Sequence, residues 1–419
     1  MRPNLTPDLD LATHLSDALR EAGFDGIGIT RDAYGPGEAR AHAMVRAAAD
    51  AIGLETACDA AGNLLMTLPG LDRAAPVTVI GSHLDSVRHG GNDDGAAGVL
   101  AGLAAVSAMR RAGFVPARDI VVLAARAEES GSWFPTGFPG SRAALGTLPP
   151  AALAARRLDT GRTLAEHMAQ EGFDPEAVRA GVCLLPPSRV AAYLELHIEQ
   201  GPLLDAAALP VGIVTAIPGA RRLRAARVVG EYNHSGATPR AYRRDAAIAL
   251  AELAYRLDEA WGELEAAGHA LVVTFCVLAT APEAGFTKIP GAAAFQLDVR
   301  SLAPDSIDAA YAALHRLAAE IERRRGVRFD FGEQLVSLPT PMSGEIQAAL
   351  ARAAGELAIP CRCMPSGGGH DAVAFAQAGV PAGMLFVRNQ NGSHSPAEAM
   401  RAEDFAAAAA VVLRWAEQA

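Results

Sequence analysis

The sequence predicts an α/β protein whose mostly parallel, helix-covered sheet is interrupted by a second, inserted domain. In the first half of the chain, short apolar runs that end in a polar residue alternate with helical patterns. Between residues 217 and 330 this alternation gives way to a different order of strands and helices. The chain has 419 residues, of which 50% are hydrophobic, which is enough for more than one core.

The parallel sheet is predicted from apolar, β-branched runs separated by helices. The first strand is expected at 77–85, followed by a helix at 96–113 and a strand at 119–129. Runs at 190–199 and 382–388 are of the same kind. Such nearly continuous apolar strands are typical of a sheet covered on both faces. The Ala-rich segment from Asp404 onwards predicts a terminal helix.

The inserted domain is predicted from the order strand, helix, strand, strand, helix, strand, which is the ferredoxin-like unit. The corresponding segments are 222–232, 246–264, 270–278, 293–302, 306–325 and 328–335. Both helices carry an apolar stripe at helical spacing. We therefore expect a domain at 217–330 inside a discontinuous domain formed by 1–216 and 331–419.

Composition excludes several classes of protein. The net charge is −10, with 47 acidic and 37 basic residues, which argues against nucleic acid and against an anionic membrane surface. No run reaches the ~20 apolar residues that a membrane span needs, and charged residues near the N-terminus exclude a secretory signal. The five cysteines are scattered and odd in number, which favours reduced thiols and a cytoplasmic protein.

Polar residues follow three predicted strands directly. His83 and Asp85 end the first, Glu128 and Glu129 the second, and His197 the third. Open α/β sheets place their ligands at the carboxyl ends of their strands, so we expect these side chains to converge. Side chains alternate along a strand, so Asp85 lies on the same face as His83, where a carboxylate commonly orients a metal-bound imidazole.

Two loops add further candidates. His394 lies in a loop after the apolar run at 382–388. The turn at 90–95 leads into a helix, and Asp93 or Asp94 in this turn is either a helix cap or a ligand. Each histidine alone is more often structural, but several histidines and carboxylates that all follow strand ends favour a metal site.

The adjacent pair Glu128-Glu129 is the least ordinary feature. Neighbouring carboxylates repel each other unless they share a cation or a proton. In a two-metal hydrolase one of them binds a metal while the other acts as general base.

A serine hydrolase is not predicted, because the chain has no G-x-S-x-G motif. The segment 366–371 lacks a Walker lysine. We interpret it as a flexible loop in which the backbone amides of Gly368 and Gly369 meet a substrate and His370 and Asp371 order the chain.

Eight motifs together resemble the M20 metallopeptidase clan, and more narrowly its hydantoinase/carbamoylase amidases. They are GSHLDSV, GGNDDGAAGVL, AEESGSWF, LELHIEQGP, NHSGATP, IPGAAAFQLDVRS, MPSGGGHDA and NGSHSP. The resemblance covers nearly the whole chain. Its most discriminating element is ELHIEQGP, because many M20 peptidases have an aspartate in place of this histidine. The inserted domain agrees with the lid and dimerisation domain of that family.

The resemblance implies two divalent metal ions. His83, Asp94 and His197 would hold one, and Asp94, Glu129 and His394 the other. Mixed imidazole and carboxylate ligands suit Zn²⁺, Mn²⁺, Co²⁺ or Ni²⁺.

The resemblance also assigns roles to residues beside the metals. Glu128 would be the base and then the acid, and Asp85 would orient His83. His234 resembles the lid residue that stabilises the oxyanion, in some relatives from the partner subunit, so a homodimer is expected. Arg300 matches the residue that clamps the substrate carboxylate, the alternative being a structural ion pair. Gln200 is a further substrate-side candidate.

Three positions depart from the family pattern. Thr287, a candidate for substrate binding, stands where an asparagine is usual. Ala220 replaces a glutamine, and Trp133 replaces an arginine. All three are expected on the substrate side, so the chemistry is expected to be intact while the specificity differs.

The sequence thus predicts a two-metal amidohydrolase for linear amide or ureido C–N bonds, with N-carbamoyl amino acids or related ureido acids as the expected substrates. The alternatives are an M20-type peptidase or an N-acyl amino acid deacylase. A catalytically inactive binding protein is disfavoured by the complete set of Glu128 and five ligands.

Overall fold

The structure is a computed structural model that describes residues 5–129 and 131–418, and it divides into two compact units. Unit 1 comprises Met1–Thr215 and Pro341–Ala419, and unit 2 comprises Ala216–Thr340. Unit 2 is therefore inserted in unit 1. It continues to Thr340 rather than to 330, because a strand after residue 330 joins its sheet.

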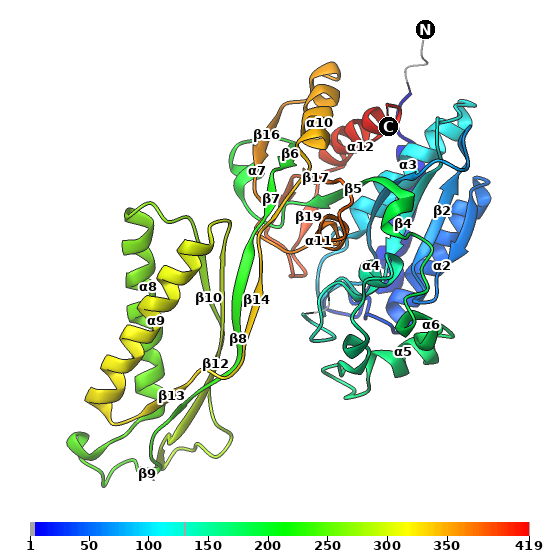
Figure 1. The fold of residues 1–419 in the computed structure, drawn as a ribbon. Helices are drawn as coiled ribbons and strands as arrows, with labels where there is room; N and C mark the ends of the chain where they lie inside the picture. The colour runs from blue at the N-terminus through cyan, green and yellow to red at the C-terminus, as the bar shows by residue number, and fades with distance from the viewer. Residues whose placement is uncertain (1–4, 130, 419) are drawn as a thin grey trace. The chain divides into compact units, whose positions relative to one another are not determined.

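Unit 1 is built on an eight-stranded sheet with the order β1-β2-β4-β3-β5-β17-β6-β16 (Figure 1). The bounds are β1 Glu55–Cys58, β2 Leu64–Leu68, β3 Val77–His83, β4 Ile120–Ala125, β5 Val190–Ile198, β6 Val211–Val214, β16 Cys361–Met364 and β17 Ala382–Val387. The central neighbours β4-β3, β3-β5 and β5-β17 are parallel. All residues of β3, β4 and β17 are buried. The predicted mostly parallel sheet is confirmed.

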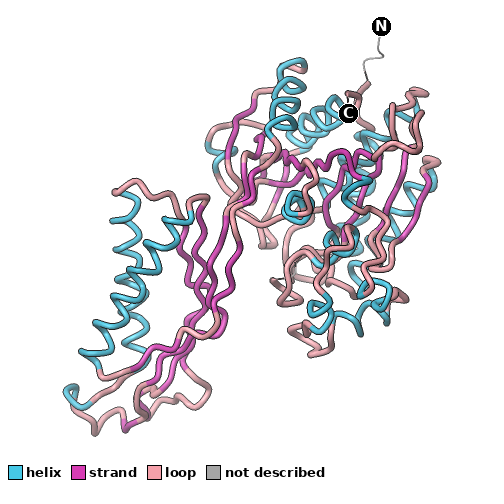
Figure 2. Tube along the Cα trace, viewed as in Figure 1, coloured by secondary structure: helices cyan, strands magenta, loops and turns pink. Residues whose placement is uncertain are grey.

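Helices and short segments complete unit 1 (Figure 2). The helices are α1 Leu9–Gly23, α2 Pro36–Ala51, α3 Ala96–Arg111, α4 Pro139–Ala144, α5 Leu164–Gln170, α6 Pro175–Arg179, α7 Leu203–Ala206, α10 Gly344–Glu356, α11 Ala372–Gln377 and α12 Ala402–Ala416. The short elements are η1 Pro150–Ala154, η2 Pro187–Arg189, β18 Asn389–Gln390 and β19 Ala399–Met400, and β15 Thr340–Pro341 spans the boundary between the two units. Within the described ranges, none of the helices combines the length and apolar character that a membrane span requires.

Helix α3 packs closely against the sheet. Every residue from Ala96 to Met109 is buried, and only the two arginines at its end reach the surface. A side chain at Gly98 would lie 2.1 Å from the carbonyl oxygen of Leu196 in β5, so only glycine permits this approach. The start of α3 is thereby held next to the end of β5.

Unit 2 has a five-stranded antiparallel sheet with two long helices on one face (Figures 1 and 2). Its order β8-α8-β10-β12-α9-β13 is the β-α-β-β-α-β order that the sequence predicts. The bounds are β7 Ala216–Ile217, β8 Gly219–Val229, β9 Asn233–His234, η3 Arg240–Tyr242, α8 Ala246–Ala266, β10 Val272–Thr280, β11 Lys288–Ile289, β12 Ala292–Ser301, α9 Pro304–Arg325, β13 Arg328–Asp330 and β14 Gln334–Ser337.

The last strand of unit 2 differs from the prediction. The sequence suggests one strand at 328–335, but the chain forms β13 and β14, which both pair with β8. Gly332 lies between them with φ +62°, outside the extended region, and breaks the strand.

All five cysteines are free. This agrees with the expectation of reduced thiols rather than a disulfide framework.

Candidate metal centre

The carboxyl ends of adjacent strands bring the predicted ligands together. His83 is the last residue of β3, His197 lies near the end of β5, and Glu129 follows β4. His394 comes from the loop after β17 and β18, and Asp94 lies directly before α3. Because these strands are neighbours in one sheet, residues as far apart in the sequence as Asp94 and His394 meet at one edge.

The five side chains form two groups of three that share Asp94. Within each group the ligand atoms lie within 4.8 Å of one another. Oδ1 of Asp94 lies 3.1 Å from Nε2 of His197 and 3.5 Å from Nε2 of His83. Its Oδ2 lies 3.5 Å from Nε2 of His394, which lies 3.3 Å from Oε1 of Glu129. The two oxygens of one carboxylate therefore face two different groups.

The protonation of the two buried histidines fits metal binding. Nδ1 of His83 lies 3.0 Å from the carbonyl oxygen of Asp85, and Nδ1 of His197 lies 2.9 Å from that of Ile198. A carbonyl only accepts, so each Nδ1 carries the proton. In the neutral ring, the form that binds a metal, each Nε2 presents a lone pair to the site, and the two Nε2 atoms lie 3.4 Å apart. Two facing lone pairs repel each other unless a cation lies between them.

Two buried oxygens of the site lack a hydrogen-bond donor among the described residues. They are Oδ1 of Asp94 and Oε1 of Glu129. Buried carboxylate oxygens are normally hydrogen-bonded, because desolvation without compensation is costly. Together with the facing imidazoles, these oxygens fit a divalent cation in each group.

Glu128 lies beside the first group. Its Oε2 is 3.7 Å from Nε2 of His83. Burial raises the pKa of the Glu128 carboxyl well above its usual range; His83 opposes this rise and Glu129 adds to it. A carboxyl group whose pKa is raised in this way suits general acid–base chemistry.

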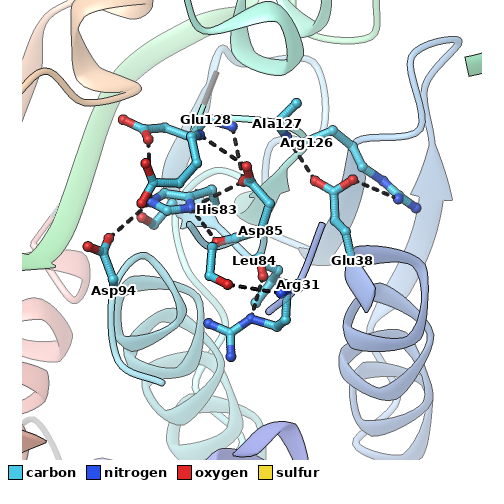
Figure 3. Close-up of polar contacts among 12 residues, drawn as sticks. Arg31, Glu38, His83, Leu84, Asp85, Asp94, Arg126, Ala127 and Glu128 are labelled. Atoms are coloured by element: carbon cyan, nitrogen blue, oxygen red, sulfur yellow. Dashed lines mark hydrogen bonds and ion pairs between the residues drawn. The ribbon is translucent and has the colours of Figure 1, made fainter. Parts of the chain in front are cut away.

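Asp85 holds both the histidine and the paired glutamates (Figure 3). Its Oδ1 lies 3.3 Å from Nδ1 of His83 and accepts the amide of Glu128 at 3.0 Å, while Oδ2 accepts the amide of Glu129 at 3.0 Å. The sequence predicts the contact with His83. The hydrogen bonds from the amides of Glu128 and Glu129 to Asp85 were not predicted.

The carboxylates of the site favour positive charge on its imidazoles. The neighbouring carboxylates of Asp94 and Glu129 raise the pKa of His394 to about 11. Burial alone lowers the pKa of His83, but Glu128, Asp85 and Asp94 outweigh it and raise that pKa well above its usual value. The carboxylates therefore make this site electrostatically suited to cations.

Removal of metal is expected to lower thermal stability. Anything that binds only the folded chain stabilises it, by about 2.7 kcal/mol at a concentration of 100 Kd. For a domain of this size that corresponds to a fall in Tm of roughly 5 °C or more after chelation. The measurement is a melting curve before chelation, after chelation and after metal is restored. An unchanged Tm at all three stages would contradict the assigned site.

Gln200 and the glycine loop reach the same site. Gln200 donates from Nε2 to Oδ2 of Asp94 at 2.9 Å, and it has φ +64°. A side chain at Gly368 would lie 2.8 Å from Oε1 of Gln200, and one at Gly369 would lie 3.1 Å from Phe138. The loop is tied by Ser366, whose Oγ lies 2.9 Å from Nε2 of His370. The structure therefore brings Gln200 and Gly368 together with the ligands.

A third grouping, Glu195, His197 and His370, also has ligand atoms within 4.8 Å of one another. It shares His197 with the first group. Glu195 already accepts from Oγ of Ser82 at 3.1 Å and from the amide of Ala372 at 2.8 Å. We therefore interpret this grouping as structural, since it supports the ligand His197.

His234 belongs to unit 2, and its protonation is defined by its own loop. Nδ1 accepts the amides of Gly236 at 3.1 Å and Ala237 at 3.0 Å. In the neutral ring the proton is therefore on Nε2, which is left as a donor. The side chain is exposed. Thr287 supports this loop, because its carbonyl accepts the amide of Ser235 at 2.9 Å.

Arg300, also in unit 2, pairs with Asp298. Its Nε and Nη2 lie 3.0 and 2.8 Å from Oδ2 of Asp298, which also accepts from Arg222 at 3.0 Å. The ion pair that was the alternative for Arg300 is thus present. In the adjacent strand Ala220 is buried opposite Arg300, so its side chain belongs to the packing of unit 2.

Trp133 is buried in unit 1. Its Nε1 donates to the carbonyl of Ser86 at 2.8 Å, and the guanidinium groups of Arg88 and Arg157 lie 5.4 and 4.7 Å from the ring centre. The indole therefore packs beside the segment that carries Asp85.

Three residues that sequence reasoning missed support the site. The buried Arg31 donates to the carbonyl of Leu84 at 2.6 Å (Figure 3). It also donates to the side-chain oxygen and the carbonyl oxygen of Asn92. Oε1 of Glu398 accepts the amides of Asp93 and Asp94, both at 3.2 Å. Glu38 holds the backbone before Glu128. Of these three residues, Glu398 alone could have been suspected from the sequence, because it follows the NGSHSP motif that contains His394.

Comparison with known proteins gives consistent matches over the chain. The profile of peptidase family M20/M25/M40 matches residues 79–418. An N-carbamoyl-L-amino acid amidohydrolase from Geobacillus stearothermophilus is 40% identical over 386 residues, which are 92% of each chain. An allantoate amidohydrolase from Escherichia coli K12 is 33% identical and covers 94% of this chain and 96% of its own.

Solved structures agree with the fold. The crystal structure of a hydantoinase/carbamoylase family amidase from Burkholderia ambifaria matches with a TM-score of 0.82 and 29% identity. The match covers 98% of this chain and 97% of that one.

Proposed function

Because this chain belongs to peptidase family M20/M25/M40, among the hydantoinase/carbamoylase amidases, we propose that it hydrolyses the ureido C–N bond of N-carbamoyl amino acids. The observation that carries the proposal is the pair of ligand groups that share Asp94, with Glu128 next to them. The 40% identity to an N-carbamoyl-L-amino acid amidohydrolase supports the substrate class.

Two divalent ions are proposed, one held by His83, Asp94 and His197 and one by Asp94, Glu129 and His394. The ligand chemistry suits Zn²⁺, Mn²⁺, Co²⁺ or Ni²⁺. Such ions lower the pKa of water and polarise a carbonyl group.

Glu128 performs the proton transfers in this proposal. Its Oε2 takes a proton from the attacking water and returns it to the nitrogen of the amino acid that leaves. The C–N bond to that nitrogen breaks. The carbamate that remains decomposes, so one water and one N-carbamoyl amino acid give an amino acid, CO₂ and ammonia. Asp85 keeps the backbone of Glu128 and the ring of His83 in place.

His234 is proposed to donate from Nε2 to the carbonyl oxygen as negative charge develops there. We expect His234→Ala to lower kcat by about 10²–10³-fold, since one oxyanion donor is lost. Metal content and Tm should stay as in the unaltered chain. The exposed His14, changed to alanine, is the matched control. Wild-type kcat in His234→Ala would remove His234 from the mechanism.

A homodimer is proposed in which His234 serves the partner's site. Mixed dimers test this directly. If His234 acts across the dimer, mixing inactive Glu128→Gln chains with His234→Ala chains regenerates one complete site per hybrid. If it acts within its own chain, mixing restores nothing.

Arg300 is proposed to bind the substrate carboxylate through its planar fork, with Asp298 holding the guanidinium in place. Thr287 stands near the His234 loop as a further substrate-side candidate. The free cysteines fit the proposed cytoplasmic location.

The proposal is tested by ammonia release from metal-loaded protein. The panel comprises N-carbamoyl amino acids of both enantiomers, ureidopropionate, allantoate and N-acetyl amino acids. Ammonia from an N-carbamoyl amino acid that is abolished by a chelator supports the proposal. Allantoate as the preferred substrate would move the chain to the second activity found among its relatives. Cleavage of N-acetyl amino acids or dipeptides alone would favour the deacylase or peptidase alternative.

A further inference from the structure

The chain bends sharply between β4 and the paired glutamates. Ala127, directly before Glu128, has φ +57° and is fully buried. This left-handed conformation is unfavourable for a residue with a Cβ and persists only where the surroundings impose it. The bend decides the direction in which the next two side chains leave the sheet.

Four consecutive backbone amides at this bend are held by side chains from distant segments. The pairs are Arg126 with Oδ1 of Asn63 at 2.9 Å, Ala127 with Oε1 of Glu38 at 2.8 Å, Glu128 with Oδ1 of Asp85 at 3.0 Å and Glu129 with Oδ2 of Asp85 at 3.0 Å. The strained residue itself depends on Glu38 (Figure 3).

Glu38 lies in the first turn of α2, and its exposed fraction is 0%. Its second oxygen, Oε2, accepts the amide of Tyr34 at 2.7 Å and Nη1 of Arg126 at 3.1 Å. One buried carboxylate thus fixes two backbone segments and one guanidinium. Among the described residues, Glu38 forms hydrogen bonds with Tyr34, Arg126 and Ala127. None of these is a ligand or Glu128, so its influence on the site passes through the backbone.

We propose that Glu38 is a positioning residue for Glu128: it holds the amide of Ala127 in the left-handed bend that directs the Glu128 carboxyl toward the reacting water. This inference rests on the proposed function, since it assumes that Glu128 is the base. The alternative is a purely structural role, in which Glu38 serves only as the ion-pair partner of the buried Arg126.

Glu38→Gln separates these roles when it is combined with Ala127→Gly. Glutamine has the size of glutamate, but its NH₂ group faces hydrogen-bond donors where glutamate presents an oxygen. The hydrogen bonds that hold the bend are therefore weakened. Glycine adopts φ +57° without strain. If Glu38 acts by holding a strained Ala127, the need for it should shrink when residue 127 is glycine.

We expect Glu38→Gln to lower kcat at least tenfold with KM within a factor of about two, and metal content unchanged. In the Ala127→Gly background the same change should lower kcat by less than about threefold. The control is Asp119→Asn at the opposite end of β4, where a buried carboxylate pairs with Arg73 at 2.9 Å and accepts the amide of Gly70. It should lower Tm and leave kcat as it is.

Three outcomes overturn the inference: wild-type kcat in Glu38→Gln, an equal loss of kcat in both backgrounds, or failure of both Glu38 variants to fold. The last would make Glu38 a requirement of folding itself. A Glu38→Gln chain that folds only with glycine at 127 and is then active supports the inference. The substrate is one that the unaltered chain has been shown to turn over, so a silent unaltered chain counts against the proposed function and not against Glu38.

Discussion

Glu128→Gln is expected to abolish turnover almost completely, with kcat lowered by about 10³-fold or more. The amide can neither take a proton from water nor return one to the leaving nitrogen, so both transfers fail. Glutamine has nearly the same volume, and Asp85 binds only the backbone of residue 128. The site should therefore keep its shape and its metal, as measured by elemental analysis and Tm.

The control for this variant is Glu403→Gln, an exposed residue in the first turn of α12. It should retain wild-type kcat. Turnover within tenfold of wild type in Glu128→Gln would refute the assignment of the base, and loss of metal would show that Glu128 is instead a ligand.

Asp94→Asn is expected to have the largest effect on metal binding. Each oxygen of Asp94 faces a different ligand group, and the neutral amide offers one oxygen in place of two. We expect the metal content to fall from two ions to near zero and activity to fall below detection. His83→Ala and His394→Ala should each weaken mainly the group to which the histidine belongs.

Metal stoichiometry after dialysis, measured on all three variants, checks this expectation. Two ions retained by Asp94→Asn would contradict a shared ligand. Loss of both ions in His394→Ala alone would show that the two groups bind cooperatively rather than through Asp94.

The sequence predicted the sheet and its edge because both depend on local patterns. The apolar runs that end at His83 and His197 became β3 and β5, and the polar residues after them converged. The βαββαβ order also follows from periodicity within each segment. The prediction was wrong at the end of the inserted domain, where the run at 328–335 reads as one strand. The structure has two strands there, because Gly332 interrupts the run.

The ligand Asp94 was ambiguous from the residues alone, since a turn before a helix is also where a capping aspartate belongs. Gly95 acts as the N-cap, with φ +67°, and a side chain there would lie 2.4 Å from the His83 ring. The close approach of the helix to the histidine is a tertiary fact that no local pattern contains.

Arg31 and Glu38 could not have been found from the sequence. Each is a charged residue in an ordinary N-terminal segment, and each acts on backbone atoms more than fifty positions away. Their hydrogen bonds leave no spacing, repeat or motif. A buried charge of this kind is recognised only when the fold shows what it touches.

The insertion of unit 2 separates the order of synthesis from the order of folding. Residues 216–340 form one uninterrupted segment and can fold as soon as they emerge from the ribosome. In unit 1, β17 lies between β5 and β6 and is made after unit 2. Until it arrives, β5 exposes an unpaired apolar edge that other chains can join. His394 follows β17 in the chain, so the second ligand group cannot be complete until both β17 and the loop after it have been made.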